Sequence, residues 1–267
     1  MHHTDALAYL LSVQPLALAT DFDGTISEIA PSPEQAVISP RCRNLLAEFA
    51  QRLPLVAVLS GRSAAEAQRL VDLPRILYLG NHGLERSQDG TTLVDPSVSG
   101  DLALIASVLE AARGELNLPG LHFEEKGSGA SIHYRLARDP VVARDRIVSV
   151  LQDLTTGTEL KVVEGRRVVE LRPSVHINKG TALFDLLTEY PVRGAIYAGD
   201  DRTDIDAFAG LHRWQHRTGG RSLAVAVASS EMPGDLRKTA DLAVEGVEGW
   251  ADLMDVLMAK LDAGDVS

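Results

Sequence analysis

Short aliphatic runs recur along the chain, separated by stretches in which apolar residues return at helical spacing. Nearly continuous aliphatic runs of this length are typical of parallel strands that are covered on both faces. The runs are Leu16–Thr20, Leu55–Leu59, Ile76–Leu79, Ala195–Ala198 and Leu223–Val227. Helical patterns lie at Pro40–Arg52, Ala64–Val71, Gly180–Tyr190 and Asp204–Ala209. Strands that alternate with helices in this order predict an α/β fold with a doubly wound, Rossmann-like sheet.

The middle of the chain follows a different pattern. It predicts helices at Leu102–Leu116 and Pro140–Asp153, and strands at Leu121–Glu125, Ala130–Arg135, Lys161–Val163 and Arg167–Leu171. The composition of these runs favours antiparallel strands with one face uncovered. We therefore expect a small α+β module inserted into the α/β core. The expected division is residues 1–100 for the first core segment, 101–175 for the insert and 176–267 for the second core segment.

Composition and charge exclude several classes of function. The chain has 267 residues, is 45% hydrophobic and 24% charged, and carries a net charge of −11. This charge argues against a nucleic-acid partner, whose phosphates are bound by Lys and Arg, but not against a small phosphorylated substrate. The single cysteine, Cys42, allows neither an intramolecular disulfide nor a thiolate zinc site. Because no apolar run approaches the ~20 residues that span a bilayer, we expect a cytoplasmic protein without a membrane partner.

The segment Asp21-Phe22-Asp23-Gly24-Thr25 follows the first predicted strand directly. In open α/β sheets, ligands bind at the carboxyl ends of the strands. Two carboxylates two residues apart repel each other there unless a cation lies between them, and Mg²⁺ prefers oxygen ligands. An Asp-Gly turn is the alternative, since both residues favour turns. The segment alone leaves both interpretations open.

Three further polar groups lie where the predicted sheet would bring them towards that segment. Ser60 follows the second strand and precedes a helix, whose first N–H groups can bind a phosphate. Lys179 lies at a helix start, which is unfavourable with the helix dipole unless an anion compensates it. Asp200, Asp201 and Asp204 follow the fourth strand, and their repulsion is hard to explain by a turn alone. Each group has an ordinary alternative, namely a loop serine, a solvated lysine and a turn.

The order of these groups carries the interpretation. Strand–DxDGT, strand–Ser, Lys at a helix start and strand–GDDxxD resemble the four motifs of the haloacid dehalogenase-like (HAD) phosphohydrolase superfamily. A finer resemblance, over nearly the whole chain, is to the trehalose-6-phosphate phosphatase family. It rests on Gly80–Glu85, Lys126 with His133-Tyr134-Arg135, Glu164–Pro173 and Gly199–Asp204. Ile205 departs from the family, which commonly has Glu there. The resemblance implies a HAD core with an inserted α+β cap that is mobile over the core.

The resemblance also implies catalytic roles for four core residues. Asp21 would attack phosphorus and form an aspartyl-phosphate. Asp23 would protonate the leaving sugar oxygen and later deprotonate the attacking water. Ser60 and Lys179 would hold the phosphoryl oxygens, which carry the charge of the transition state.

A Mg²⁺ cofactor and a sugar-binding set are implied in the same way. The metal would be held by Asp21, Asp23 (through its carbonyl) and Asp200, with Asp201 and Asp204 supporting these ligands. The implied substrate-binding residues are Arg62, His82, Glu85 and Asn178 in the core, and Glu124, Lys126, Arg135, Arg166 and Glu170 in the cap. Glu124 is preferred to Glu125 only by its spacing to Lys126. A solvated strand residue is the alternative for each cap residue, and a structural histidine for His82.

The implied function is hydrolysis of trehalose 6-phosphate to trehalose and inorganic phosphate. The implied partner is a small sugar phosphate, with a functional link to a trehalose-phosphate synthase. Another sugar phosphatase, acting on sucrose phosphate or mannosylglycerate phosphate, would share the four core motifs and differ in the cap. A phosphomutase is a further alternative. A non-catalytic sugar-phosphate sensor is disfavoured, because Asp21, Asp23, Lys179 and Asp200 are all present.

Overall fold

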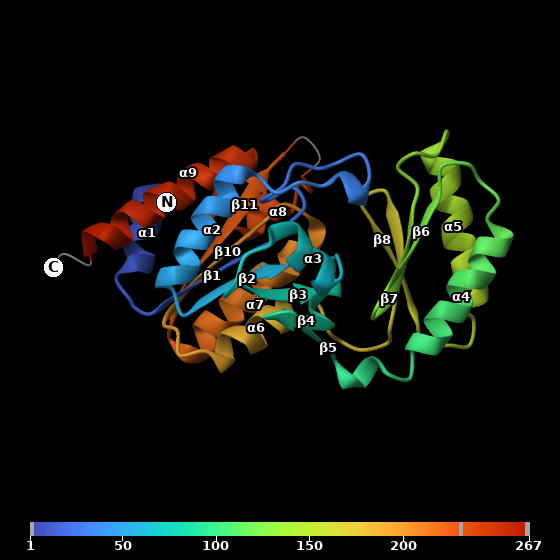
Figure 1. The fold of residues 1–267 in the computed structure, drawn as a ribbon, viewed down its shortest axis with the longest axis horizontal. Helices are drawn as coiled ribbons and strands as arrows, with labels where there is room; N and C mark the ends of the chain where they lie inside the picture. The colour runs from blue at the N-terminus through green and yellow to red at the C-terminus, as the bar shows by residue number, and fades with distance from the viewer. Residues whose placement is uncertain (1–2, 230–231, 265–267) are drawn as a thin grey trace. The chain divides into compact units, whose positions relative to one another are not determined.

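The computed structural model describes residues 3–229 and 232–264, and the chain divides into two compact units (Figure 1). The first unit comprises residues 1–30, 36–92 and 177–267. The second comprises residues 31–35 and 93–176, so most of it is an insertion in the first. The predicted fold class, an α/β core with an inserted α+β unit, is confirmed. The predicted functional boundaries at residues 100 and 175 stay predictions.

An eight-stranded sheet forms the centre of the first unit. In chain order its strands are β1 (Leu16–Thr20), β2 (Leu55–Leu59), β3 (Leu77–Gly80), β4 (Glu85–Gln88), β5 (Thr91–Val94), β10 (Gly194–Gly199), β11 (Arg221–Ala228) and β12 (Leu242–Glu245). Their spatial order is β12-β11-β10-β1-β2-β3-β4-β5. Neighbours from β12 to β3 are parallel, and β4 pairs antiparallel with β3. The central strands β1, β2 and β10 are buried along their whole length, as expected for strands covered on both faces.

Helices cover both faces of this sheet (Figure 1). On one face lie α1 (His3–Leu11), α2 (Pro40–Arg52), α3 (Ala64–Val71) and α9 (Gly246–Gly264). On the other lie α6 (Lys179–Glu189), α7 (Arg202–Thr218) and α8 (Leu236–Thr239). Each face has its own apolar core, which contains Trp250 on the first side and Trp214 on the second. Within the described residues, no helix combines the length and the apolar character needed to cross a membrane.

Four elements, β1, β2, α2 and α3, have the bounds that the sequence predicts. The largest difference is α7, which was expected to end at Ala209 and runs on to Thr218. Gly210 lies inside this helix and allows close packing against α6. A Cβ at this position would lie 2.1 Å from Gly180 O. The helix ends instead at Gly219, whose φ of 72° is left-handed. The aliphatic pattern also missed β4, β5, β12, α1, α8 and α9.

The second unit is a four-stranded antiparallel sheet with two helices on one face (Figure 1). The strands β6 (His122–Lys126), β7 (Gly129–His133), β8 (Lys161–Gly165) and β9 (Val168–Arg172) lie in the order β6-β7-β9-β8. The helices α4 (Leu102–Glu115) and α5 (Pro140–Leu154) bury an apolar core against the sheet. The predicted strand Ala130–Arg135 ends two residues early, because the chain turns at Arg135. Short 3-10 turns lie at Pro33–Gln35 and Pro96–Val98 in this unit, and at Asn81–Gly83 in the first.

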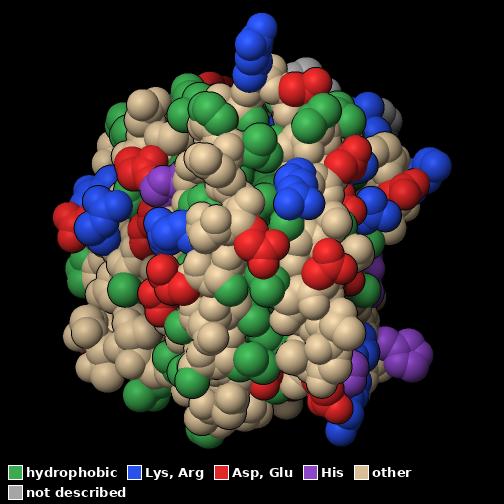
Figure 2. Space-filling view, turned by 90° about the vertical axis from the view of Figure 1, so that its right-hand side faces the viewer, with side chains coloured by type: hydrophobic (Ala, Val, Ile, Leu, Met, Phe, Trp, Pro, Cys, Tyr) green, Lys and Arg blue, Asp and Glu red, His purple; other side chains and the backbone are tan. Residues whose placement is uncertain are grey.

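The outer side of α4 and α5 carries mixed side chains (Figure 2). Arg144 pairs with Asp145 on this layer, and Val141 and Val142 are exposed beside them. Acidic, basic and apolar side chains alternate over the face shown, without a continuous basic surface.

Candidate functional site

The carboxyl ends of β1 and β10 bring the first and last predicted motifs together. The two strands are parallel neighbours, with Thr20 opposite Ala198. The Asp21 amide continues this ladder and donates to Ala198 O at 2.8 Å. Asp21 and Asp200 therefore leave adjacent strands at the same edge of the sheet. Both are buried, as the ligand position of a doubly wound sheet predicts.

Lys179 joins this edge from the start of α6. Its Nζ lies 2.8 Å from Asp21 Oδ1 and 2.7 Å from Asp204 Oδ1. Burial alone would lower the pKa of Lys179, but the carboxylates of Asp204 and Asp21 outweigh burial and raise that pKa. The lysine is therefore a permanent cation. The sequence predicted an anion beside this lysine at the helix start, and the structure provides two, the carboxylates of Asp21 and Asp204.

Asp204 is the most fully hydrogen-bonded carboxylate of the site. Its Oδ1 accepts from Lys179 Nζ and from the Tyr197 hydroxyl, both at 2.7 Å. Its Oδ2 accepts from the amides of Asp200 at 3.0 Å and Asp201 at 2.9 Å. Burial raises the pKa of Tyr197 well above its usual value, so the phenol keeps its proton and donates. Since a carboxylate has about four lone-pair positions, Asp204 is fully used in holding its neighbours.

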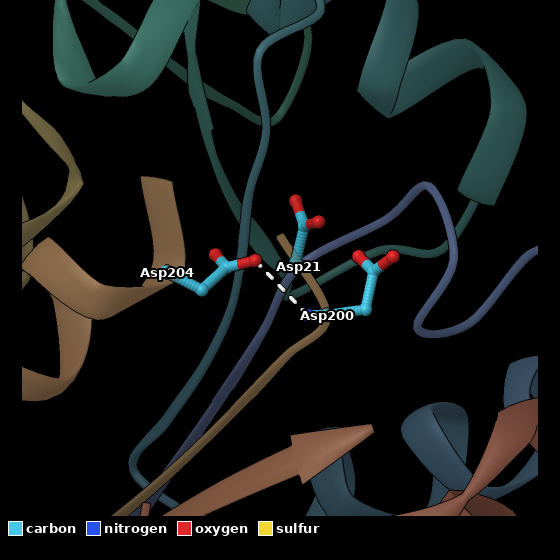
Figure 3. Close-up of side chains that lie close together, drawn as sticks. All are labelled: Asp21, Asp200 and Asp204. Carbon is cyan, nitrogen blue, oxygen red and sulfur yellow. Dashed lines mark hydrogen bonds between the residues drawn. The ribbon is translucent and has the colours of Figure 1, made fainter. Parts of the chain in front are cut away.

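Asp21, Asp200 and Asp204 form a compact acidic cluster (Figure 3). One carboxylate oxygen from each lies within 4.8 Å of the other two. Burial raises the pKa of Asp21 well above its usual value; Lys179 opposes this shift, while Asp204 and Asp200 add to it. Three buried carboxylates facing one lysine are under-neutralised, so the cluster favours binding of a further cation.

The donor set fits the metal that the sequence predicts. With Asp204 fully used, the carboxylates of Asp21 and Asp200 are the members of the cluster that remain to hold a cation. Such an all-oxygen set suits Mg²⁺. Gly24 makes room for the Asp200 carboxylate, since its φ is 84° and a Cβ there would lie 2.1 Å from Asp200 Oδ2. The cluster thus fits a divalent cation.

The Asp23 carboxylate lies apart from this cluster and pairs with Arg62. Arg62 Nε donates to Asp23 Oδ2 at 2.7 Å and Nη2 donates to Oδ1 at 2.8 Å. The third guanidinium nitrogen, Nη1, donates to Glu66 on α3. Burial alone would lower the pKa of Arg62, but the carboxylates of Asp23 and Glu66 outweigh burial and raise that pKa. Ser63 caps α3 by accepting from the Glu66 amide, which fixes the helix turn that presents Glu66.

Ser60 lies in the loop that follows β2, and its Oγ accepts from the Arg62 amide at 3.1 Å. The backbone of His82 donates to Ser60 O at 3.0 Å, so the loops after β2 and β3 are joined. His82 is buried with a left-handed φ of 59°. A Cβ on Gly61 would lie 3.0 Å from His82 Cε1, so this glycine gives the imidazole its space. The structure thus places Ser60, Arg62 and His82 on two linked loops.

Glu85 and Asn178 are engaged within the chain. The Glu85 carboxylate accepts from Ala64 N at 2.8 Å and from Asn81 Nδ2 at 2.7 Å, which ties the start of α3 to the loop after β3. Asn178 Oδ1 accepts from the Thr181 amide at 2.9 Å and so caps α6, the helix that carries Lys179. These contacts favour a positioning role for both residues over direct contact with a substrate.

In the second unit, alternation along β6 places Glu124 and Lys126 on the face of the sheet opposite the helices. Phe123 packs against the apolar core on the other face, so Glu125 lies on that side too. Lys126 Nζ lies 3.3 Å from Glu170 Oε1 on β9 and 4.0 Å from Glu124 Oε2. Three of the five predicted cap residues are therefore together, and the choice of Glu124 over Glu125 agrees with the strand geometry.

The two cap arginines lie outside the strands. Arg135 is in the turn after β7, and Arg166 is in the turn between β8 and β9. Arg167, in the same turn, has a φ of 59° and accepts a hydrogen bond from the Tyr134 amide at 3.0 Å. The two turns are thereby joined, which brings the segments of Arg135 and Arg166 near each other.

Sequence reasoning missed several residues that support these sites. They are Tyr197 on β10, Glu66 on α3, Asn81 after β3, and His133 and Arg172 in the cap sheet. The i,i+4 spacing of Arg62 and Glu66 was a signal that could have found one of them. Arg172 lies two residues from Glu170 on β9, so the period of two was a signal for it as well.

Comparison with known proteins decides the family. The family model described as Trehalose-phosphatase matches residues 19–247. The chain belongs to the trehalose-phosphatase family. A trehalose-phosphate phosphatase of Mycobacterium tuberculosis is 38% identical over 209 residues, which cover 74% of this chain and 52% of the relative. One of Mycobacterium marinum is 34% identical over 261 residues, which cover 94% of this chain and 63% of the relative.

The chain therefore spans about half to two thirds of the length of the curated relatives that it matches. Solved structures with this family's fold also match. The C-terminal domain of a trehalose-6-phosphate phosphatase of C. albicans superposes with a TM-score of 0.78 at 18% identity, over 96% of each chain. A trehalose-6-phosphate phosphatase related protein gives a TM-score of 0.76 at 22% identity, over 93% of this chain and all of the other. At such identities the likeness supports the fold alone.

Proposed function

We propose that this chain hydrolyses trehalose 6-phosphate to trehalose and inorganic phosphate. The observation that carries the proposal is the contact of Asp21 with Lys179, beside Asp200, in a member of the trehalose-phosphatase family. The activity is named for curated relatives that are longer than this chain, so it comes to the chain as a proposal.

In the first step, Asp21 attacks phosphorus. A bond forms between an Asp21 carboxylate oxygen and phosphorus, and the bond from phosphorus to the sugar oxygen breaks. Lys179 holds Asp21 Oδ1 at 2.8 Å, which orients the carboxylate. Mg²⁺, held by Asp21, Asp200 and the Asp23 carbonyl, would supply the positive charge that screens the carboxylate from the phosphate. Ser60 and Lys179 would bind the phosphoryl oxygens as negative charge moves through the transition state.

Asp23 would move the protons of both steps. It would give a proton to the leaving sugar oxygen, and would then take one from the water that attacks the aspartyl-phosphate. Water attack on phosphorus releases inorganic phosphate and restores the Asp21 carboxylate. In the structure, both Asp23 oxygens accept from Arg62, and each keeps a second lone-pair position that could carry the proton.

The sugar would be recognised by the cap residues Glu124, Lys126, Arg135, Arg166 and Glu170. Carboxylates and cations on one face of a sheet provide the acceptors and donors that sugar hydroxyls need. Arg62 and His82 would act from the core loops. A synthase that supplies the substrate stays a prediction.

A substrate panel tests the proposal. Phosphate release from trehalose 6-phosphate should exceed release from glucose 6-phosphate, sucrose 6-phosphate and mannosylglycerate phosphate, and should stop with a chelator. Preference for one of the other sugars would overturn the assignment of substrate and keep the chemistry. Formation of an isomeric sugar phosphate in place of inorganic phosphate would indicate a mutase.

Glu170→Ala adds a test of the cap. It should lower kcat/KM for trehalose 6-phosphate far more than for p-nitrophenyl phosphate, because the small ester has no sugar to bind. Equal losses on both substrates would remove Glu170 from the sugar-binding set.

A further inference from the structure

The face of the cap sheet opposite the helices carries a charged cluster around one small residue, Ser131. On β7, Ala130 and Ile132 belong to the apolar core beneath α4 and α5, so Ser131 points to the other face. Ser131 pairs directly with Glu124 on β6 and with Glu170 on β9. Directly paired residues have Cβ atoms about 4.5–5.5 Å apart and point the same way. Ser131 therefore lies at the bottom of a row, between two glutamates.

The Ser131 hydroxyl is buried, with 1% of the residue exposed, and finds no hydrogen-bond partner among the residues that the structure describes. Its two glutamate neighbours are held by other side chains. Glu124 Oε2 lies 2.8 Å from His133 Nε2, and Glu170 Oε2 accepts from Arg172 Nε at 2.8 Å. Because a buried hydroxyl without a partner costs free energy, this oxygen is unexplained by the cap alone and points to a ligand.

Lys126 spans the row that contains Ser131. Its Nζ lies 3.3 Å from Glu170 Oε1 and 4.0 Å from Glu124 Oε2, the two carboxylates on either side of the serine. A lysine side chain has four rotatable bonds and can move aside when a ligand offers its carboxylate partners other donors.

The charges of the cluster indicate which class of ligand fits. The carboxylates of Glu124 and Glu170 contact the side chains of Lys126, His133 and Arg172. A neutral polyol can donate to the carboxylates and accept from the lysine and the serine.

We propose that Ser131 is a specificity-determining residue, whose hydroxyl donates to a hydroxyl oxygen of the sugar ring held by Glu124 and Glu170. This inference rests on the proposed function and deepens it. It assigns a residue at the floor of the cap cluster to recognition of a neutral sugar unit.

The test compares Ser131→Ala with the wild-type enzyme on trehalose 6-phosphate and on p-nitrophenyl phosphate. Loss of one neutral hydrogen bond should lower kcat/KM for trehalose 6-phosphate by about threefold to tenfold, with unchanged kcat/KM for the small ester. Thermal stability should be equal or higher, because the substitution removes a buried hydroxyl without a partner. Ser131→Thr, which keeps the hydroxyl and suits a strand, should retain more of the preference than Ser131→Ala. The matched control is Ser149→Ala, which replaces an exposed serine on α5.

Three results would overturn the inference. Equal kcat/KM values for Ser131→Ala and wild type on trehalose 6-phosphate would refute the sugar contact and leave the proposed function standing. Equal losses on both substrates would show that Ser131 acts through the fold. Lower thermal stability with an unchanged substrate ratio would assign the hydroxyl to a buried water. If the wild-type enzyme cleaves the small ester but not trehalose 6-phosphate, the proposed function itself has failed.

Discussion

Arg62 and Asp23 form a two-point ion pair, in which Nε and Nη2 donate to the two carboxylate oxygens at 2.7 and 2.8 Å. Glu66 holds the same guanidinium from α3. The proposed acid-base residue is thus oriented by an arginine that is itself anchored to a helix. In this arrangement each Asp23 oxygen accepts one hydrogen bond from Arg62 and keeps a further lone-pair position.

Arg62→Lys is expected to lower kcat/KM for trehalose 6-phosphate, because lysine cannot reproduce the two-point contact. Loss of one hydrogen bond to a charged group, about 1.5–3 kcal/mol, predicts a loss of roughly tenfold to a hundredfold. Steady-state kinetics measures it, with Arg69→Lys, an exposed position on α3, as the matched control. Wild-type kcat/KM in Arg62→Lys would show that the pair does not contribute to turnover.

The Asp21→Asn and Asp23→Asn variants should be blocked at different steps of the reaction. Asp21→Asn removes the proposed nucleophile, and turnover should fall about 10⁴-fold or more. Asp23→Asn should still form the aspartyl-phosphate from p-nitrophenyl phosphate, whose leaving group needs no proton, and should then hydrolyse it slowly. Rapid mixing would record a burst of nitrophenol close to one equivalent per enzyme, and Asp21→Asn is its control. A burst from Asp21→Asn would exclude that residue as the nucleophile.

Asp204 should matter for stability as well as for activity. Asp204→Ala leaves Lys179 with Asp21 alone and removes the acceptor of Tyr197 and of two amides. Breaking a buried ion pair on one side costs about 3–5 kcal/mol of unfolding free energy, which denaturant titration measures. Tyr197→Phe, which removes one donor, should cost about 1 kcal/mol. If Asp204→Ala were no worse than Tyr197→Phe, the four-donor arrangement would not hold the site together.

A divalent cation should stabilise the folded chain by neutralising the acidic cluster. At a Mg²⁺ concentration 100 times its Kd, linkage predicts about 2.7 kcal/mol of added unfolding free energy. Thermal unfolding with MgCl₂ and with a chelator measures this without any substrate. Asp200→Asn should lose most of the effect, whereas Asp235→Asn, an exposed position, should keep it. A wild-type protein with the same stability in both buffers would contradict the metal site.

His212 and Asp241 should give stability that depends on pH. His212 Nε2 lies 3.1 Å from Asp241 Oδ2. The hydrogen bond to Asp241 raises the pKa of His212 above its ordinary value, and the pKa of Asp241 is lowered by His212 and the Ala224 amide in spite of burial. The raised histidine pKa means that its contribution is complete below the unfolded pKa of about 6.5 and is lost as pH rises through the folded pKa. The aspartate contribution is lost as pH falls through its lowered pKa.

The difference in unfolding free energy between wild type and His212→Gln should therefore be larger at pH 5.5 than at pH 8.5. Because the pair is partly exposed, we expect at most about 0.5 kcal/mol. Urea unfolding at both pH values measures it, with His216→Gln on the same helix as the control. An equal difference at both pH values would show that the pair does not titrate with folding.

The sequence determined which edge of the central sheet carries the acidic residues, because these residues follow their strands directly along the chain. The strand Leu16–Thr20 is followed directly by Asp21, and the strand Gly194–Gly199 is followed directly by Asp200. Parallel strands present their carboxyl ends at one edge of the sheet. The period of two along β6 likewise decides that Glu124, and not Glu125, shares a face with Lys126. Polar edge strands such as β4 carry no aliphatic run, and the pattern did not find them.

Only the tertiary structure decided which charged and polar groups contact one another. Asp204 was expected to support the metal ligands, but its four donors come from α6, β10 and the chain just after β10, and no spacing shows that they meet on one carboxylate. The ion pair between Arg62 and Asp23 joins two loops, and the two residues are 39 positions apart in the sequence. The place of Ser131 between Glu124 and Glu170 depends on the register of three strands. Contacts of this kind are set by packing between distant segments, and packing is what a linear pattern does not contain.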